Sequence, residues 1–389
     1  MLPFIGQKFG ATSFQVSILF TLMPAIVIVM APVWGRLSDR YGRKPVFMGA
    51  LGASALTFVA FGMADTLQEM FYARALQGVT GGSVAIAFAM VADSTTHDNR
   101  AKYLGYVSAA MAMAFFVGPM LGGFLMGSDL ESFSHARPAY VAAGLCIVAT
   151  VIGLALLKET RSGAGRRMAA IARQTGPHQT PDTDEDEDDA PPVSVVLGRV
   201  GLAALIAQFF IGGYVSGQDQ FVFAFWAQGL HGWGPDDVSF GMAAMGLGYM
   251  VATGGLVGPL TKRLGDLGAY LFGAVLDAAG LCLLLLSDNV WLGAAGLWLA
   301  VIGIGVWNTV LSSVMSKVSP PDQVGYMLGL SNGFSMAGRV AGPLIAGSFF
   351  IDISPEVPFM VSLGLVAIVI ANAVRLTAAQ ARARSARSG

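Results

Sequence analysis

Charged residues are scarce in this sequence of 389 residues. Only 12% of the residues are charged, whereas 54% are hydrophobic. A typical soluble domain carries about 25% charged residues, roughly twice as many. Residues 16–33 and 46–64 contain no charge at all. Because a helix needs about 20 mostly apolar residues to cross a bilayer, this composition indicates an integral membrane protein with several spans.

Residues that would indicate enzyme chemistry or a cofactor are also few. The two cysteines, Cys146 and Cys282, lie inside apolar runs, where we expect small core residues and neither a disulfide nor a metal site. None of the four histidines has metalloprotease spacing, and no lysine follows a glycine, which excludes a GKS or GKT phosphate-binding loop. The sequence therefore predicts no enzyme, ATP-driven pump, metal or cofactor. A net charge of −1 gives no reason to expect a nucleic-acid partner.

The apolar segments predict an all-α polytopic membrane protein. Their length excludes the strands of a barrel, which are about half as long, and unpaired backbone groups exclude open sheets in lipid. Eleven spans are expected, at residues 14–35, 45–64, 68–92, 103–126, 138–157, 199–224, 237–259, 267–287, 290–314, 324–350 and 355–376.

Basic residues predict the orientation of these spans. If the loop at residues 36–44 faces the cytoplasm and the sides alternate, nineteen of the 23 lysines and arginines fall in inner segments. Lys8 and Arg137 fall in outer segments, and Arg74 and Arg339 fall inside spans. Positive charge collects on the cytoplasmic side of membrane proteins, so this arrangement places the C-terminus in the cytoplasm of a bacterial-type inner membrane.

An internal repeat divides the chain into two halves. Gly35, Leu37, Arg40 and Gly42 recur 223 residues later as Gly258, Leu260, Arg263 and Gly265; Gly105, Gly118, Pro119 and Gly123 recur 224 residues later as Gly329, Gly342, Pro343 and Gly347. We expect an N-terminal helical bundle at 1–157, a charged cytoplasmic linker at 158–198, a six-helix bundle at 199–376 and a basic cytoplasmic tail at 377–389. The linker contains the acidic run 182–189 and is expected to be disordered, either as a solvated connection or as a docking segment.

The first half has one span fewer than the second. The repeat therefore predicts a further span before residue 14, and residues 1–11 have the composition of the outer end of such a helix. Two interpretations remain open: a reading frame that starts late or is truncated, and a genuine eleven-span protein whose N-terminus lies outside.

Three motifs identify a family. The sequence from Gly35 to Lys44, GRLSDRYGRK, resembles the signature loop between the second and third helices of the major facilitator superfamily. Residues 74–78 (RALQG) resemble its fourth-helix signature, and 118–123 (GPMLGG) its antiporter-type fifth-helix signature. The resemblance covers essentially the whole chain, and the second half is similar to the tetracycline/proton antiporter group.

The resemblance implies a secondary active transporter. We expect proton-coupled export of small amphipathic molecules or drugs by alternating access, with a small-molecule substrate, protons and the bilayer as partners and a monomer as the functional unit. Thr57 stands where the tetracycline group has an acid, and Tyr249 where it has a histidine, so tetracycline itself is not predicted. A facilitator-type importer of a sugar or organic acid and a non-transporting truncated carrier are the competing functions.

Residues of the signature loop are the candidate gate. The resemblance places Asp39 against the start of the eleventh superfamily helix, near Gly325, where the unpaired amides of a helix N-terminus favour a carboxylate. Arg40 and Arg43 are expected to pair with acids at neighbouring helix ends, and Asp93 is the nearest candidate in sequence. Gly35 and Gly42 fit close helix packing and a tight turn. The competing interpretation is that this loop only fixes the orientation of the protein.

Polar residues inside spans are the candidate proton or substrate sites, because an intramembrane charge is costly and usually functional. Arg74 and Gln77 are expected to control a proton site or the cavity, unless Arg74 merely reaches the interface. Asp277 either forms an ion pair with Arg339 or carries protons itself. Asp219, beside Gln218, either faces the cavity or lies at an interface. Family geometry places Trp307 and Asn308 in the cavity, and Gly118, Pro119, Gly122 and Gly123 either seal the fifth helix or simply pack it.

Overall fold

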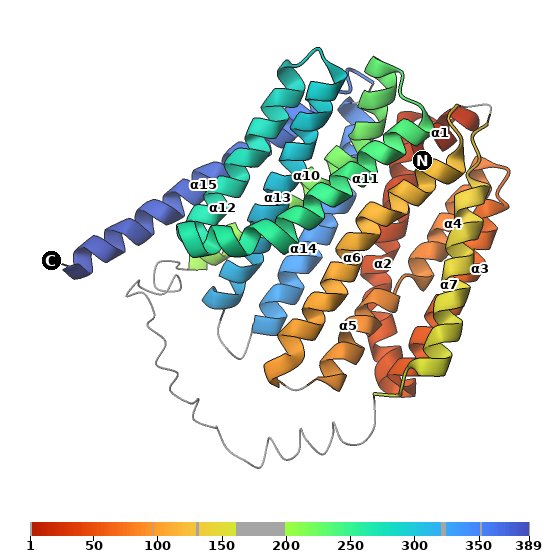
Figure 1. Cartoon of the computed structure of the whole chain (residues 1–389), viewed down its shortest axis with the longest axis horizontal. Helices are drawn as coiled ribbons and strands as arrows, with labels where there is room; N and C mark the ends of the chain where they lie inside the picture. The colour runs from red at the N-terminus through yellow and green to blue at the C-terminus, as the bar shows by residue number, and fades with distance from the viewer. Residues whose placement is uncertain are drawn as a thin grey trace.

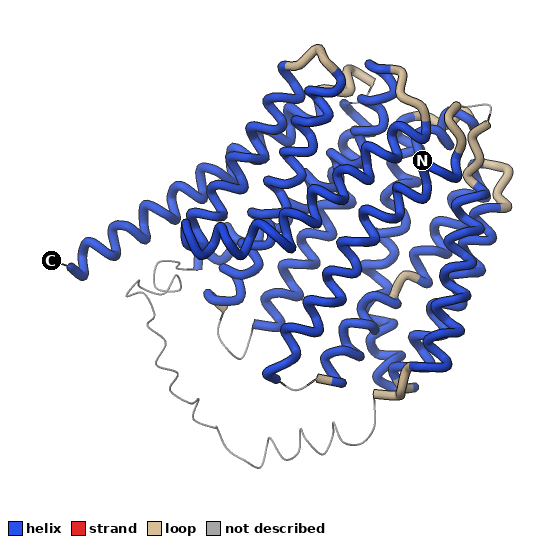
Figure 2. Tube along the Cα trace, viewed as in Figure 1, coloured by secondary structure: helices blue, strands red, loops and turns tan. Residues whose placement is uncertain are grey.

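The computed structural model describes residues 2–95, 97–129, 132–160, 199–319, 324–350 and 352–388. Every regular element within these ranges is a helix, as Figures 1 and 2 show. Eight helices are long and apolar enough to cross a membrane, judged by length and composition. The all-α fold expected from the sequence is confirmed.

The first half consists of the helices up to residue 156, drawn red to yellow in Figure 1. They are α1 (Leu2–Lys8), α2 (Ser13–Tyr41), α3 (Arg43–Gly62), α4 (Leu67–Thr80), α5 (Ser83–Ser94), α6 (His97–Met126) and α7 (Ala136–Leu156). Two of them begin with a capping box, in which the side chains at the N-cap and three residues later satisfy each other's backbone amides: Thr12 with Gln15 for α2, and Thr66 with Glu69 for α4.

The fourth expected span, residues 68–92, is divided into α4 and α5. The break falls at Gly81 and Gly82, since glycine is a poor helix former. Both glycines lie against α2: a β-carbon on Gly81 would stand 2.6 Å from Val27, and one on Gly82 would stand 2.1 Å from the Trp34 ring. The chain therefore turns where α2 approaches too closely for any larger residue.

The second half contains α10 (Arg199–His231), α11 (Pro235–Val251), η1 (Ala252–Leu256), α12 (Val257–Leu286), α13 (Val290–Val318), α14 (Val324–Ile345), η2 (Ala346–Phe350) and α15 (Val357–Ser388). Helix α12 is kinked at Gly265, whose φ of 70° resembles the 105° of Gly42 between α2 and α3. These two glycines occupy equivalent positions of the sequence repeat, so the repeat is present in the backbone as well. Residues of the basic tail continue α15.

The two halves meet through α2 with α14 and through α6 with α11. We call the end of the bundle that carries the α2–α3 turn the Arg43 end, and the opposite end the Lys8 end. At the Lys8 end, Ser13 Oγ donates to Asp352 Oδ1 at 2.9 Å and Gln228 Nε2 donates to Gln7 Oε1 at 2.7 Å. Both interhalf side-chain hydrogen bonds found within the described ranges are at this end, so the halves are joined there in this conformation.

Candidate functional site

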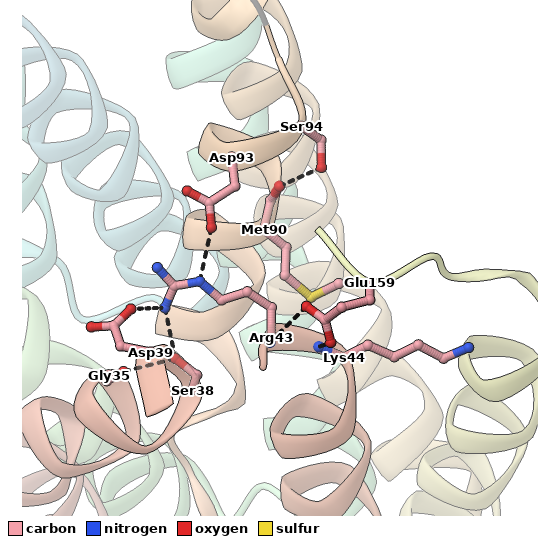
Figure 3. A network of polar contacts seen from close by, with 9 residues as sticks. All are labelled: Gly35, Ser38, Asp39, Arg43, Lys44, Met90, Asp93, Ser94 and Glu159. Carbon is pink, nitrogen blue, oxygen red and sulfur yellow. Dashed lines mark hydrogen bonds and ion pairs between the residues drawn. The ribbon is translucent and has the colours of Figure 1, made fainter. Parts of the chain in front are cut away.

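Arg43 is the centre of an ionic cluster at the Arg43 end (Figure 3). Its Nη1 lies 2.8 Å from Asp39 Oδ1 and donates to Ser38 Oγ at 2.7 Å, while its Nε lies 2.9 Å from Asp93 Oδ2. The expected pairing of Arg43 with Asp93 is confirmed. Because Asp93 is at the end of α5, the cluster ties the α2–α3 turn to the fourth span of the same half.

Glu159 extends this cluster from the far side of α3. Its carboxylate accepts hydrogen bonds from the backbone amides of Arg43 (2.9 Å) and Lys44 (3.1 Å), the first residues of α3. A carboxylate at a helix N-terminus satisfies unpaired N–H groups and the positive end of the helix dipole. The sequence had placed Glu159 in the solvated linker; the structure instead makes it part of the first half, and residues 161–198 lie outside the described ranges.

Other predictions for this loop have mixed outcomes. The Arg40 guanidinium lies over the Tyr41 ring at 5.4 Å. The side-chain surroundings of Gly325 lie outside what the structure describes, so its contact with Asp39 stays a prediction. Gly35 is in the middle of α2, and a β-carbon there would meet nothing within 4 Å; close helix packing at Gly35 is therefore not found in this conformation.

Arg74 and Gln77 line a cavity of about 250 Å³ inside the first half, between α3, α4, α6 and α7. Arg74 Nη1 donates to Gln77 Oε1 at 3.2 Å, and its guanidinium lies 5.4 Å from the centre of the Phe61 ring. These contacts are inside the bundle, as a functional arginine requires. His135, which the sequence gave no role, also lines the cavity and has its Nε2 3.1 Å from Ala64 O.

Two nitrogens beside this cavity have no hydrogen-bond partner, Arg74 Nε and His135 Nδ1. The equivalent surface of the second half is filled. Pro138 of the cavity wall corresponds to Ser362, 224 residues later, and Ser362 is fully buried against α10. The two halves therefore differ most at this surface.

Asp277 does not pair with Arg339, which corrects one of the two interpretations of these residues. Although both side chains belong to the described residues, no ion pair joins them; Asp277 Oδ2 instead accepts a hydrogen bond from Trp307 Nε1 at 3.0 Å. The carboxyl group is almost completely buried, and its Oδ1 has no partner. The pair fails because Arg339 is on α14, where its backbone packs on Gly217 of α10, whereas Asp277 packs on Gly303 of α13.

Asp219 is buried within the second half, at neither of the places expected for it. Its Oδ1 accepts a hydrogen bond from Ser362 Oγ of α15 at 2.7 Å. Gln218 Nε2 donates to the same hydroxyl at 2.8 Å and to Pro358 O at 2.5 Å. Ser362 is a residue that sequence reasoning missed; the only signal was a hydroxyl in an otherwise apolar span.

The remaining polar residues of this region are also internal to the second half. Tyr270 Oη donates to Gln208 Oε1 of α10, and the Tyr270 and Trp307 rings are 6.2 Å apart in an edge-to-face arrangement. Asn308 lies close to Gly212 of α10. The described side chains thus bring Trp307 together with Asp277, and Asn308 with α10.

Glycines of the fifth-helix motif have divided tasks. Gly118 and Gly122 line the first-half cavity, whereas Gly123 packs against Ser239 and Phe240 of α11 in the other half. In the second-half copy, Gly347 packs against Ser17 of α2 and Gly342 against α10. Pro119 lies inside α6, which remains one continuous helix. These contacts support close packing between halves as one role of the motif.

The described part of the chain holds no group of three or more histidine, cysteine or acidic residues that could bind a metal. Its candidate chemistry is therefore limited to proton exchange at Asp219 and Asp277 and to ionic contacts at Arg43 and Arg74.

Known proteins were compared with the chain at the level of sequence. The family described as Major Facilitator Superfamily matches residues 1–234 and, a second time, residues 205–388. The class G tetracycline resistance protein of Vibrio anguillarum is 30% identical over 326 residues, which cover 84% of this chain and 78% of that protein. Multidrug resistance protein 1 of Bacillus subtilis (strain 168) is 26% identical over 361 residues, covering 88% and 82%.

Among solved structures, the human organic anion transporter MFSD10 (TETRAN) superposes with a TM-score of 0.65 at 19% identity. The match covers 92% of this chain and 83% of that one. At this identity the likeness concerns the fold, and it agrees with the two-bundle arrangement described above.

Proposed function

Because the chain belongs to the major facilitator superfamily and is an integral membrane transporter, we propose that it exports small amphipathic molecules in exchange for protons. We further propose that it acts as a monomer in a bacterial inner membrane, with the Arg43 end and the C-terminus in the cytoplasm. The similarity to tetracycline and multidrug resistance proteins supports the substrate class. The excess of basic residues at the Arg43 end supports the orientation.

One observation carries the proton coupling: Asp219 and Asp277 are both buried in the second half, and neither has a cationic partner among the described side chains. Ser362 and Trp307 are the donors that meet them. A buried carboxylate without a counter-charge is costly, whereas the protonated acid is not. Such groups can alternate between the two forms as the bundle opens to one side and then the other.

The conformation is consistent with alternating access. The halves are hydrogen-bonded at the Lys8 end, while the acids Asp39 and Asp93 at the other end remain exposed. We therefore interpret the structure as the state closed at the Lys8 end, which in the proposed orientation opens to the cytoplasm.

The test uses everted membrane vesicles with an acid interior and a fluorescent dye that reports the pH gradient. Addition of tetracycline or ethidium should release protons from vesicles that contain the protein. The Asp277→Asn variant, expressed to the same level, should release none. If neither compound releases protons, antiport of this substrate class is wrong, and uptake of a labelled sugar or organic acid would then favour the import function.

A further inference from the structure

The second half contains an ionic cluster like that of Arg43 but with every charge reversed. Lys317 Nζ lies 2.6 Å from Asp266 Oδ2. Asp266 follows the positive-φ Gly265, as Arg43 follows Gly42; Lys317 is the last residue but one of α13, as Asp93 is of α5. The two ion pairs are therefore equivalent under the internal repeat.

The third member of each cluster is reversed too. Asp39 precedes Arg43 by four residues, and its equivalent, Lys262, precedes Asp266 by four. The first-half triplet is thus acid, base, acid (Asp39, Arg43, Asp93), and the second-half triplet is base, acid, base (Lys262, Asp266, Lys317). We call these the first and second triplets.

The exposure of the side chains follows the same order in both triplets. The central residues are the least exposed, Arg43 at 15% and Asp266 at 21%. The outer residues are more exposed: Asp39 at 63%, Asp93 at 38% and Lys317 at 61%, and Lys262 is also exposed. The outer charges, negative in one half and positive in the other, are therefore available for a second partner.

The packing of the halves indicates which outer charges would meet. Helix α2, which carries Asp39 near its end, packs on α14, and the chain enters α14 from the end of α13 at Lys317. In the same way α11, continued through η1 to Lys262, packs on α6, and the chain enters α6 from the end of α5 at Asp93. The repeat relates one of these two neighbourhoods to the other.

From these observations we propose that the Arg43 end closes through two symmetry-related ion pairs between the halves, Asp39 with Lys317 and Lys262 with Asp93. Arg43 and Asp266 stay within their own halves and hold the outer charges in place. Opposite charges on equivalent surfaces allow the two ends to attract each other, whereas two copies of the same triplet would repel. This inference rests on the proposed function, because it assumes that the Arg43 end closes during transport.

Exchanging whole triplets separates contacts within a half from contacts between halves. The first-triplet exchange is Asp39→Lys, Arg43→Asp and Asp93→Lys; the second is Lys262→Asp, Asp266→Lys and Lys317→Asp. Either exchange alone keeps opposite charges within each half but places like charges across the interface. We expect each to reduce export of ethidium or tetracycline about tenfold, the effect of two exposed ion pairs lost to repulsion, and the combined six-residue variant to recover most of it.

A role confined to each half predicts the reverse: either exchange alone would be harmless. That result, or a correctly folded six-residue variant with no recovery, would overturn the proposal. Folding is checked by expression, by elution as a single species in detergent and by melting temperature.

Crosslinking tests closure without transport, in a chain whose native Cys146 and Cys282 are changed to serine. Asp39→Cys with Lys317→Cys, and separately Lys262→Cys with Asp93→Cys, should be joined by a short bifunctional thiol reagent. Ser13→Cys with Asp352→Cys is the matched control, because these side chains already touch at the Lys8 end. Protein joined at the Arg43 end should no longer form the control crosslink.

The two experiments fail in distinguishable ways. Crosslinks at the Arg43 end without proton release by any compound would support the ion pairs but count against proton-coupled export. Proton release without either crosslink, while the control pair reacts, would overturn the ion pairs and leave the proposed function intact. The crosslinks also decide the matter if an exchanged variant does not fold.

Discussion

Ser362 Oγ donates a hydrogen bond of 2.7 Å to Asp219 Oδ1 and so joins α15 to α10 inside the second half. A hydroxyl has one proton to donate, and Gln218 Nε2 already donates to the same oxygen at 2.8 Å. The direction of the bond is therefore fixed: the amide of Gln218 turns the hydroxyl proton of Ser362 toward the acid.

Changing Ser362 to alanine should destabilise the protein and impair transport. The substitution leaves Asp219 without this donor and the Gln218 amide without one of its acceptors, and unpaired buried polar groups cost about 1–3 kcal/mol each. The melting temperature in detergent and the release of protons by ethidium measure the two effects. Ser362→Thr, which keeps the hydroxyl, should resemble the unmodified protein; an alanine variant with unchanged stability would show that the bond contributes little.

A double-mutant cycle should find coupling between Asp277 and Trp307 and none between Asp277 and Arg339. The indole N–H is the donor that meets Asp277, so Asp277→Asn and Trp307→Phe should have non-additive effects on unfolding. Asp277→Asn and Arg339→Leu should be additive within about 0.5 kcal/mol, as expected for residues without a shared contact. Recovery of expression in the second double variant would contradict the structure and restore the ion pair.

Gly42 should tolerate no side chain, in contrast to Gly35 one helix away. Its φ of 105° is costly for any L-residue, and a β-carbon would stand 2.7 Å from Glu159 Oε2. Gly42→Ala should therefore destabilise the protein by about 1–2 kcal/mol or more and displace Glu159 from the α3 amides. Gly35→Ala, in mid-helix with nothing within 4 Å, should be neutral or slightly stabilising. Thermal unfolding of both variants compares them directly.

His135 should make stability depend on pH in the mildly acidic range. Burial lowers the pKa of this imidazole below its ordinary 6.5, although its contact with Ala64 O opposes the shift. The unfolded chain then binds more protons than the folded one as the pH falls through about 6.5. Stability should therefore decrease below that pH, and His135→Gln should remove this part of the decrease. A variant with the same pH profile as the unmodified protein would show that His135 does not cause it.

The sequence by itself determined the class of the protein. Scarce charge and apolar runs of about 20 residues require membrane helices, since only helices and closed barrels satisfy the backbone in lipid. The repeat at an offset of 223–224 residues predicted two related halves, and the left-handed Gly42 and Gly265 bear this out in the backbone. The contact between Arg43 and Asp93 was also predictable, because both lie at helix ends on the same side.

Only the tertiary structure decided which polar residues meet. Asp277 pairs with Trp307 and not with Arg339, and Asp219 turns to Ser362, because the rotation of each helix about its axis selects the partner. In a helix that is apolar all round, no amphipathic pattern records that rotation. Glu159 likewise belongs to the first half although its neighbours in sequence are linker, since the amides that it binds lie more than a hundred residues away. The reversed charges of the two triplets were present in the sequence, but their meaning depended on the ion pair between Lys317 and Asp266 that folding brings together.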